Sequence, residues 1–356
     1  MNRKQWACLT LTLLLGALAL VVGAVVIIDP FEIYHQATAF IPPIANGTQI
    51  YSNAGIAKNY EYDSVVIGSS MTENFLPSQL DGLLGGRFVK LPINAGSPYN
   101  HRQMMEMAFG THDVRRVIYG VDVELFTYFY NQPKCEMPDY LYDSSLLNDV
   151  RYWFNESVLA RYIPQCLLTL GQRDETQRDT MYTWGDLYVY GLDAMLADVS
   201  LTVGRVVQQD ARNDTPVLAQ ASLLNVEHNI LPFITAHPET EFIFFLPPYS
   251  AARWYQFYAN GTLSYHLNQK EAIIDTLLAY DNVRIFDFQA RTDWITNPDN
   301  YIDSSHYGPW INSAMAEAIA RDEYRITAVA QAQANDAEIE RLVLAIADAG
   351  RWLDEF

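Results

Sequence analysis

Five short apolar runs, separated by segments with helical periodicity, constrain the fold of this 356-residue chain more than any other feature. Each run reads as a strand that is buried on both faces. Strands that alternate with helices predict a parallel sheet with helices on both sides. The expected strands are Ser64–Gly68, Phe88–Ile93, Val114–Gly120, Glu241–Leu246 and Asn282–Phe286. We therefore predict an α/β fold, in which a parallel β-sheet is flanked by helices in three layers.

Polar residues and glycines follow three of these runs. In a parallel sheet, ligand sites lie at the carboxyl ends of the strands, so Ser70, Gly96 and Asp122 are expected to meet at one edge. Near the end of the chain, Asp303 and His306 lie three residues apart in a turn-rich stretch. A serine hydroxyl needs a base to take its proton, and the base needs a carboxylate to fix its tautomer. This combination is typical of serine-based acyl chemistry.

Ser70, His306 and Gly96 could each have a purely structural role instead. The stretch Ser70-Met-Thr-Glu73 fits a capping box, in which Ser70 caps a helix and Glu73 caps it in return. His306 could likewise cap a helix end within its loop, and Gly96 could mark a strand-to-loop turn. Ser69 is a second candidate nucleophile.

The ordered set of motifs resembles the SGNH (GDSL-type) hydrolases. Members carry a Gly-Asp-Ser motif after the first strand, a glycine after the second, Gly-x-Asn after the third and Asp-x-x-His near the C-terminus. The corresponding blocks here are Gly68-Ser69-Ser70, Asn94-Ala-Gly96-Ser97, Gly120-Val-Asp122 and Asp303-Ser-Ser-His306. Two of them depart from the family, with Ser69 in place of Asp and Asp122 in place of Asn.

The resemblance implies that Ser70 is the nucleophile, His306 the base and Asp303 the residue that orients it. The oxyanion hole would involve Ser70, Gly96 and position 122. A carboxylate cannot donate a hydrogen bond unless it is protonated. Either the backbone N–H groups of Ser70 and Gly96 form the hole alone, or Asp122 faces elsewhere.

The chain is most similar to a divergent, membrane-anchored branch of this superfamily. That branch includes alginate O-acetyltransferase-like proteins and the D-alanine transfer protein of teichoic acid synthesis. The similarity implies an esterase or O-acyltransferase that acts on a cell-envelope or secreted polysaccharide, without a cofactor or metal, next to a polytopic membrane partner. Two alternatives stay open: a catalytically inactive envelope protein that binds glycan or scaffolds an assembly, and a lipid-directed esterase.

The N-terminal segment predicts a membrane anchor. The run Ala7–Ile28 contains no charged residue and is long enough to cross a bilayer as a helix. Arg3 and Lys4 precede it, so the positive-inside bias places the N-terminus in the cytoplasm and the chain after Asp29 outside. A signal peptide cleaved after Ala17-Leu-Ala19 is the alternative, although that triplet interrupts the apolar run instead of ending it.

We expect the chain to be organised around one large domain with an anchor. The predicted parts are a cytoplasmic tail (1–6), a transmembrane anchor (7–28), a juxtamembrane connector (29–55), a hydrolase-like domain (56–330) with a helical insertion at about 127–235, and a C-terminal helix (331–356). The insertion is rich in aromatic residues, which either stack on sugar rings or pack its own core.

The net charge bears on the possible binding partners, and the cysteines bear on a possible disulfide. A net charge of −19 argues against nucleic acid and disfavours docking of the globular part on an anionic membrane surface. Cys135 and Cys166 could form a disulfide that closes a loop of about 30 residues. Two separate buried thiols are the alternative.

Overall fold

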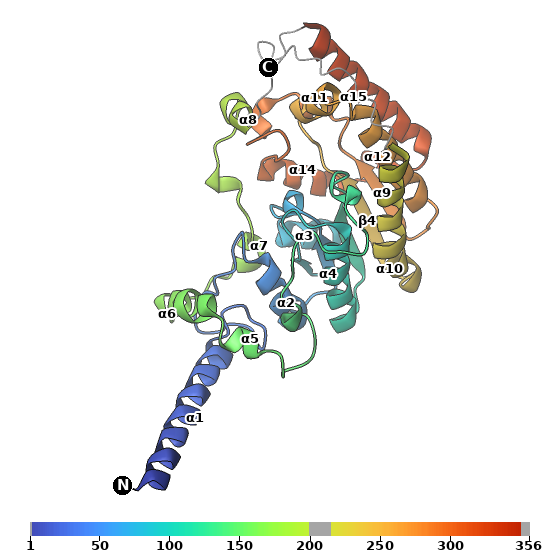
Figure 1. The fold of residues 1–356 in the computed structure, drawn as a ribbon. Coiled ribbons are helices and arrows are strands. Elements are labelled where there is room, and N and C mark those ends of the chain that lie inside the picture. Colours follow the sequence, from blue (N-terminus) through green and yellow to red (C-terminus); the bar gives the residue numbers. More distant parts are fainter. Residues whose placement is uncertain (1, 199–214, 350–356) are drawn as a thin grey trace. The chain divides into compact units, whose positions relative to one another are not determined.

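The computed structural model describes residues 2–198 and 215–349 and divides the chain into two compact units (Figure 1). The first unit comprises residues 1–60 and 137–177, and the second comprises 61–136 and 178–356. Part of the expected insertion thus groups with the N-terminal segment. Residues 199–214 of that insertion and 350–356 of the expected C-terminal helix lie outside the described residues.

A six-stranded sheet forms the centre of the second unit, in the order β2-β1-β3-β4-β5-β6. The strands are β1 (Ser64–Ile67), β2 (Phe88–Lys90), β3 (Arg116–Gly120), β4 (Glu241–Leu246), β5 (Val283–Asp287) and β6 (Arg325–Ile326). The first five strands run parallel, and β6 pairs antiparallel with β5. The predicted α/β fold is confirmed. The two-residue strand β6 was not predicted, because so short a strand has no readable periodicity.

The apolar runs form central strands because both of their faces are buried. The register pairs Val66 with Ile118 and Ile118 with Ile243 across three neighbouring strands. None of these side chains is exposed to solvent. The sheet therefore has no solvated face, which explains the continuous hydrophobic runs in the sequence.

Helices flank the sheet in two groups (Figure 1). In one group α3 contacts α14 and β2, and in the other α4, α9, α12 and α15 contact one another in succession. The helices of this unit are α3 (Pro77–Leu84), α4 (Pro98–Thr111), α8 (Leu192–Asp198), α9 (Thr215–Asn229), α10 (Leu231–Ala236), α11 (Ala251–Ala259), α12 (Leu263–Leu277), α13 (Thr292–Ile295), α14 (Pro309–Ala320) and α15 (Val329–Ala349), with α7 (Gln177–Thr180) at the border between the units.

A buried ion cluster fastens α15 to the sheet. The Lys270 ammonium on α12 lies 2.6 Å from a carboxylate oxygen of Asp287, at the end of β5, and 2.6 Å from one of Asp336 on α15. All three residues are almost fully buried. Buried charges of this kind are tolerated only when they are paired, so the cluster fixes three elements together.

The first unit contains the long N-terminal helix α1 (Arg3–Ile28), which is long and apolar enough to cross a membrane by length and composition. Its other helices are α2 (Gln49–Asn59), α5 (Val150–Trp153) and α6 (Ile163–Leu168), with a π-helical turn at Val158–Tyr162. Val25, near the end of α1, is buried in a core that also contains Phe31, Tyr152 and Ile163.

The structure has the cysteines as free thiols. Cys166 is buried and belongs to the first unit, whereas Cys135 is half-buried and belongs to the second. The pairing that the sequence left open is therefore not formed here.

Candidate active site

Ser70, His306 and Asp303 form a continuous hydrogen-bonded chain. The Ser70 Oγ lies 2.8 Å from Nε2 of His306, and Nδ1 of His306 lies 2.6 Å from Oδ2 of Asp303. The other carboxylate oxygen of Asp303 accepts the backbone N–H of His306 at 2.6 Å and that of Ser305 at 2.7 Å. Asp303 thus holds both the ring and the backbone of His306. All three predicted residues come together at the carboxyl edge of the sheet.

The turn after β1 presents Ser70 to His306. Ser69 is the N-cap of a 3₁₀ turn at Ser70–Thr72, and its hydroxyl accepts the Met71 N–H at 3.4 Å. The capping box that could have employed Ser70 is not formed, because Ser69 occupies the cap position and α3 begins only at Pro77. The Ser70 hydroxyl is therefore directed to His306 instead of a helix terminus.

Two glycines allow the turn at Ser70–Thr72 to pack closely against the ends of β1 and β3. A Cβ at Gly68 would lie 2.6 Å from the methyl carbon of Thr72, and a Cβ at Gly120 would lie 2.8 Å from it. Both distances are shorter than real contacts, so the close approach of Thr72 requires glycine on each side. Gly68 of the Gly-Ser-Ser motif and Gly120, the last residue of β3, therefore share one packing role.

The loop that carries His306 is tied to the turn that carries Ser70. The Met71 carbonyl accepts a hydrogen bond from the Tyr307 hydroxyl and another from the Asn312 side-chain amide, each at 3.0 Å. Tyr307 follows His306 directly, and Asn312 lies on α14. These two bonds hold the loop that carries His306 at a fixed distance from the turn that carries Ser70.

A second set of bonds holds the same loop to the segment after β4. The Ser250 hydroxyl donates to the Ser304 carbonyl at 2.6 Å, and the Tyr301 hydroxyl donates to the Pro248 carbonyl at 2.8 Å. The position of His306 is consequently set by contacts with the segments that follow β1 and β4, two strands that β3 separates in the sheet.

Asp122 serves as a hydrogen-bond acceptor. One of its carboxylate oxygens accepts a hydrogen bond from the Tyr249 hydroxyl, and the other accepts one from the Ser69 hydroxyl at 3.3 Å. It does not donate toward Ser70. Of the two interpretations of this departure from the Gly-x-Asn motif, the structure fits the one in which Asp122 faces elsewhere.

Of the two expected oxyanion donors, one N–H group is already hydrogen-bonded within the protein and the other is not. The Gly96 N–H donates to the Ile93 carbonyl at 2.8 Å within the turn before α4, so it does not offer the free donor that we expected. The Ser70 N–H, in contrast, has no hydrogen-bond acceptor within residues 2–198 and 215–349. One backbone donor therefore stands beside the Ser70 hydroxyl.

The charges around His306 favour its protonated form. Burial alone lowers the pKa of His306, but the hydrogen bond and charge of Asp303, with the charges of Asp122 and Glu73, outweigh burial and raise the pKa above its ordinary value. Burial raises the pKa of Asp303, and its bonds to His306 and to the backbone N–H groups of Ser305 and His306 lower it overall. The pair is thus built to carry an imidazolium next to a carboxylate.

Trp184 is a site residue that sequence reasoning did not single out. Its ring meets the His306 ring edge-on, with centroids 5.6 Å apart. The Asn74 side chain, a few residues after Ser70, accepts the backbone N–H groups of Trp184 and Gly185 at 3.0 and 3.3 Å. Trp184 lies in the aromatic-rich insertion, and no periodicity or motif links it to His306.

The aromatic residues of the expected insertion include both buried and exposed side chains. Several are buried, including Tyr152, Tyr182 and Trp184, and pack the protein core. Tyr188 packs edge-on against Trp184, with ring centroids 5.8 Å apart, and is 53% exposed. An exposed aromatic ring therefore lies next to the tryptophan that contacts His306.

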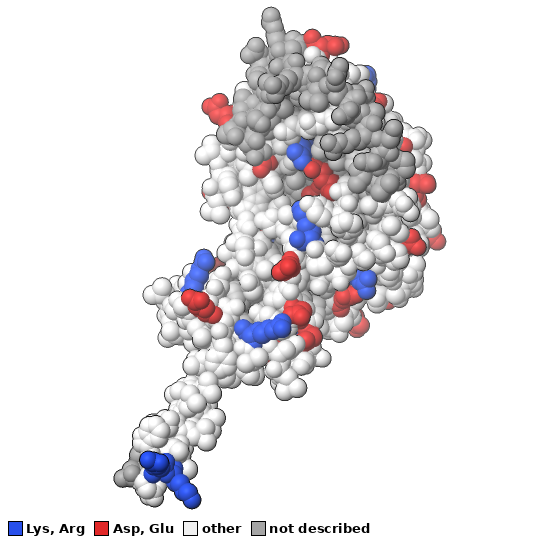
Figure 2. All heavy atoms as spheres, viewed as in Figure 1, with Lys and Arg blue, Asp and Glu red and all other residues white. Residues whose placement is uncertain are grey.

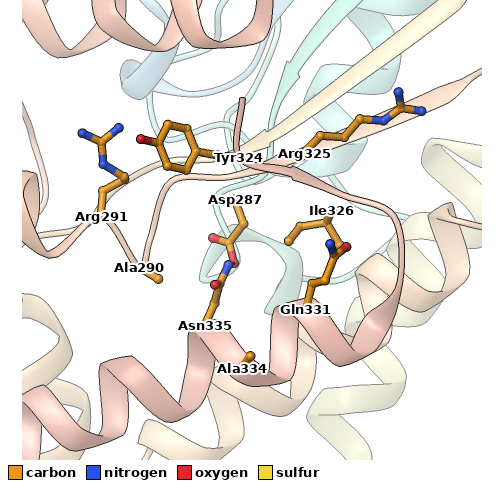
Figure 3. Close-up of a pocket in the computed structure, with 9 residues that line it drawn as sticks. All are labelled: Asp287, Ala290, Arg291, Tyr324, Arg325, Ile326, Gln331, Ala334 and Asn335. Atoms are coloured by element: carbon orange, nitrogen blue, oxygen red, sulfur yellow. The ribbon is translucent and has the colours of Figure 1, made fainter. Parts of the chain in front are cut away.

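A separate pocket lies at the carboxyl end of β5 (Figure 3). It has a volume of about 370 Å³, and Arg291 and Tyr324 stack on each other at its rim, 4.4 Å apart. None of Ser70, Asp303 and His306 lines it. We assign no part of the candidate active site to this pocket.

Comparisons with known proteins do not identify a family for this chain. No family model and no curated protein matches the sequence. Among the solved structures, one that is provisionally described as a platelet activating factor, from Streptococcus pneumonia, matches with 13% identity and a TM-score of 0.40. The match covers 77% of this chain and 90% of the other. At this level of similarity the match carries no argument about function.

Proposed function

We propose that this protein is a serine-dependent acyl-ester enzyme in which Ser70 is the nucleophile, His306 the general base and acid, and Asp303 the residue that orients the imidazole. One observation carries the proposal, the unbroken chain of short contacts from Ser70 Oγ through His306 to Asp303. The resemblance of the motifs to SGNH hydrolases supports the same assignment.

The first half-reaction follows from this geometry. Ser70 Oγ attacks the acyl carbonyl carbon while Nε2 of His306 takes the hydroxyl proton. The negative charge that develops on the carbonyl oxygen would meet the free N–H of Ser70. The C–O bond to the leaving alcohol then breaks, His306 returns the proton to that alcohol, and an acyl-Ser70 ester remains.

The second half-reaction decides between hydrolysis and transfer. Water or a sugar hydroxyl gives its proton to His306 and attacks the acyl carbon. The bond between that carbon and Ser70 Oγ then breaks, and His306 returns the proton to Ser70 Oγ, with an acid or a new ester as product. Both outcomes use the same side chains and differ in whether an acceptor excludes water. We favour transfer of an acetyl-like group to a cell-envelope or secreted polysaccharide.

Two features support an acceptor of this kind. Tyr188, exposed beside Trp184, could stack on a sugar ring. The helix α1 could hold the enzyme at the membrane, where envelope polymers are assembled. A polytopic membrane protein that delivers the acyl group would then be its partner.

A protein that keeps this fold but binds glycan without catalysis is the second candidate. It is favoured by the occupied Gly96 N–H and by the acidic residue at position 122, both of which weaken an oxyanion hole. The three short contacts among Ser70, His306 and Asp303 argue against it, because a binding protein has no need to preserve them.

An assay of full-length protein in detergent separates these functions. Wild-type protein and the variants Ser70→Ala, His306→Ala and Ser69→Ala are given a chromogenic acetyl ester, with or without polysaccharide oligomers as acceptors. An acyltransferase yields acetylated oligomers, detected by mass spectrometry, whereas an esterase yields acetate alone. Wild-type protein that is folded and binds the oligomers without turnover would instead support the binding protein.

A further inference from the structure

The first unit exposes a set of large apolar side chains. These residues, which we call the collar, are Leu146, Leu147, Phe154, Leu167, Leu168 and Leu170. Leu147 is 92% exposed and Leu168 is 80% exposed. Single exposed leucines are common on protein surfaces, but several within two short segments of one unit indicate a surface that something covers.

The segments that carry the collar pack against the end of α1. Both α5 and α6 contact α1. Val25 on α1 shares a buried core with Tyr152, which lies on α5, and with Ile163, which begins α6. The collar therefore belongs to elements that surround the last turns of α1.

Helix geometry places those turns at a membrane boundary. A helix rises about 1.5 Å per residue, so roughly 20 residues cross a hydrocarbon layer of about 30 Å. If Trp6, which is 62% exposed, lies at the first boundary as tryptophans commonly do, the opposite boundary falls near residue 26. This is the level of Val25 and hence of the elements that carry the collar.

The side chains of α1 itself agree with this depth. Figure 2 shows the stem of α1 free of charged side chains, with basic ones at its N-terminal end. Ile27 is 74% exposed, although it lies beside the folded unit. The apolar surface of α1 thus extends as far as Ile27, which lies at the level of the collar.

The charge of the first unit is compatible with contact to lipid. Residues 1–60 and 137–177 contain six Lys and Arg and eight Asp and Glu, a net charge of −2 out of −19 for the whole chain. The acidic character that disfavours membrane docking therefore belongs to the other unit. Arg151 and Arg161 are exposed within the collar segments, where long cationic side chains can reach lipid phosphates.

We infer that the collar inserts into the headgroup and acyl-chain boundary of the bilayer that α1 crosses, so that the first unit lies in the membrane surface. The collar is then an interfacial contact with lipid, formed by the protein on its own. This inference rests on a membrane crossing by α1 and is independent of the chemistry at Ser70.

Spin labels at collar positions test the inference in the full-length protein. The native cysteines are replaced by serine, and single cysteines at Leu147, Leu168 and Leu344 carry a nitroxide. Leu344, 47% exposed on α15, is a matched exposed leucine outside the collar. The labelled proteins are reconstituted in vesicles of phosphatidylethanolamine and phosphatidylglycerol at low protein density. Collisions with oxygen, which partitions into lipid, are compared with those of a water-soluble nickel chelate.

Insertion predicts that the labels at Leu147 and Leu168 favour oxygen over the nickel chelate several-fold more strongly than the label at Leu344 does. Equal accessibility at the three positions would overturn the inference and assign the collar to a protein partner. Protection that arises only at high protein density, with dipolar broadening between labels, would also overturn it, because a second copy would then cover the collar. Both label positions are largely exposed, so labelling there leaves the folded core intact. The replacement of buried Cys166 is common to all three labelled proteins and cancels in the comparison.

Discussion

At the scale of single residues, the proposed chemistry depends on the protonation state of His306. It must be neutral to accept the Ser70 proton, yet its surroundings raise its pKa. We expect kcat/KM for an acetyl ester to rise with pH through an apparent pKa above the ordinary histidine value of about 6.5. Asp303→Asn removes the main contribution that raises this pKa and should shift the pH profile to lower pH while reducing the maximal rate.

The pH–rate profile and a direct titration of His306 by NMR check this prediction. The contribution of His306 to folding stability decreases with rising pH, whereas activity increases. A raised histidine pKa contributes stability that is fully present below the unfolded value and is lost as pH rises through the folded value. An unchanged apparent pKa in Asp303→Asn would contradict the assigned role of Asp303.

The sequence allowed Ser70, Asp303 and His306 to be predicted because each stands in a short motif with a chemical requirement. It did not allow the roles of Trp184 and Tyr249 to be predicted. Trp184 reaches His306 through Asn74, and Tyr249 reaches Asp122 from the end of another strand. Such contacts depend on tertiary placement, which no local pattern encodes.

At the scale of elements, the 3₁₀ turn that carries Ser70 depends on close packing against β3. In Gly120→Ala, the new Cβ would meet the Thr72 methyl carbon at 2.8 Å. We expect a loss of about 1–3 kcal/mol in the free energy of unfolding. Thr72→Ser removes that methyl group but keeps the hydroxyl, which donates to the Ser69 carbonyl at 2.8 Å.

A double-mutant cycle measured by chemical denaturation tests this packing. Thr72→Ser alone should cost about 1 kcal/mol for the lost buried methyl group. Gly120→Ala should cost clearly less in the Thr72→Ser background than in the wild type. Additive effects would show that Thr72 is not the residue that requires glycine at position 120.

The ion cluster beneath α15 makes a second prediction at this scale. Lys270→Met would leave the buried carboxylates of Asp287 and Asp336 without their cation. We expect the free energy of unfolding to fall by about 3–5 kcal/mol, because an unpaired buried charge is costly. The matched control Lys134→Met removes a half-buried lysine elsewhere in the same unit and should change stability by less than about 1 kcal/mol. Equal effects of the two substitutions would be incompatible with the cluster.

Elements were predictable to different degrees. The five parallel strands could be predicted because both faces of each are buried, so their hydrophobic runs are continuous. The alternative in which Ser70 caps a helix is not met, because the segment after Ser69 is a 3₁₀ turn that Ser69 caps. The grouping of residues 137–177 with the N-terminal segment had no signal in the sequence, because their packing partners lie far away in the chain.

At the scale of the whole molecule, the N-terminal helix and the charge distribution predict that the chain is anchored in a membrane by α1. The second unit carries 17 of the 19 net negative charges, which favours an aqueous surrounding for it. Full-length protein should remain in the membrane fraction after alkaline extraction and should keep its N-terminus. Protease added from outside should remove a C-terminal tag and spare an N-terminal one.

Intact mass spectrometry of the membrane fraction checks this anchor. A mass that includes residues 1–19 is expected for an uncleaved helix, with or without the initiator methionine. A mature chain that begins at position 20 would show cleavage after Ala19 and contradict the anchor. Release of the full-length chain by alkali would contradict membrane crossing.

The central claim is that Ser70 is a nucleophile activated by His306, and covalent labelling tests it most directly. Full-length protein is incubated with a serine-directed fluorophosphonate, digested, and the modified residue is identified by peptide mass spectrometry. The proposal predicts an adduct on Ser70 that is lost in Ser70→Ala and His306→Ala and retained in Ser69→Ala, whose hydroxyl contacts Asp122. No adduct on the folded wild-type protein, or an adduct on Ser69, would contradict it.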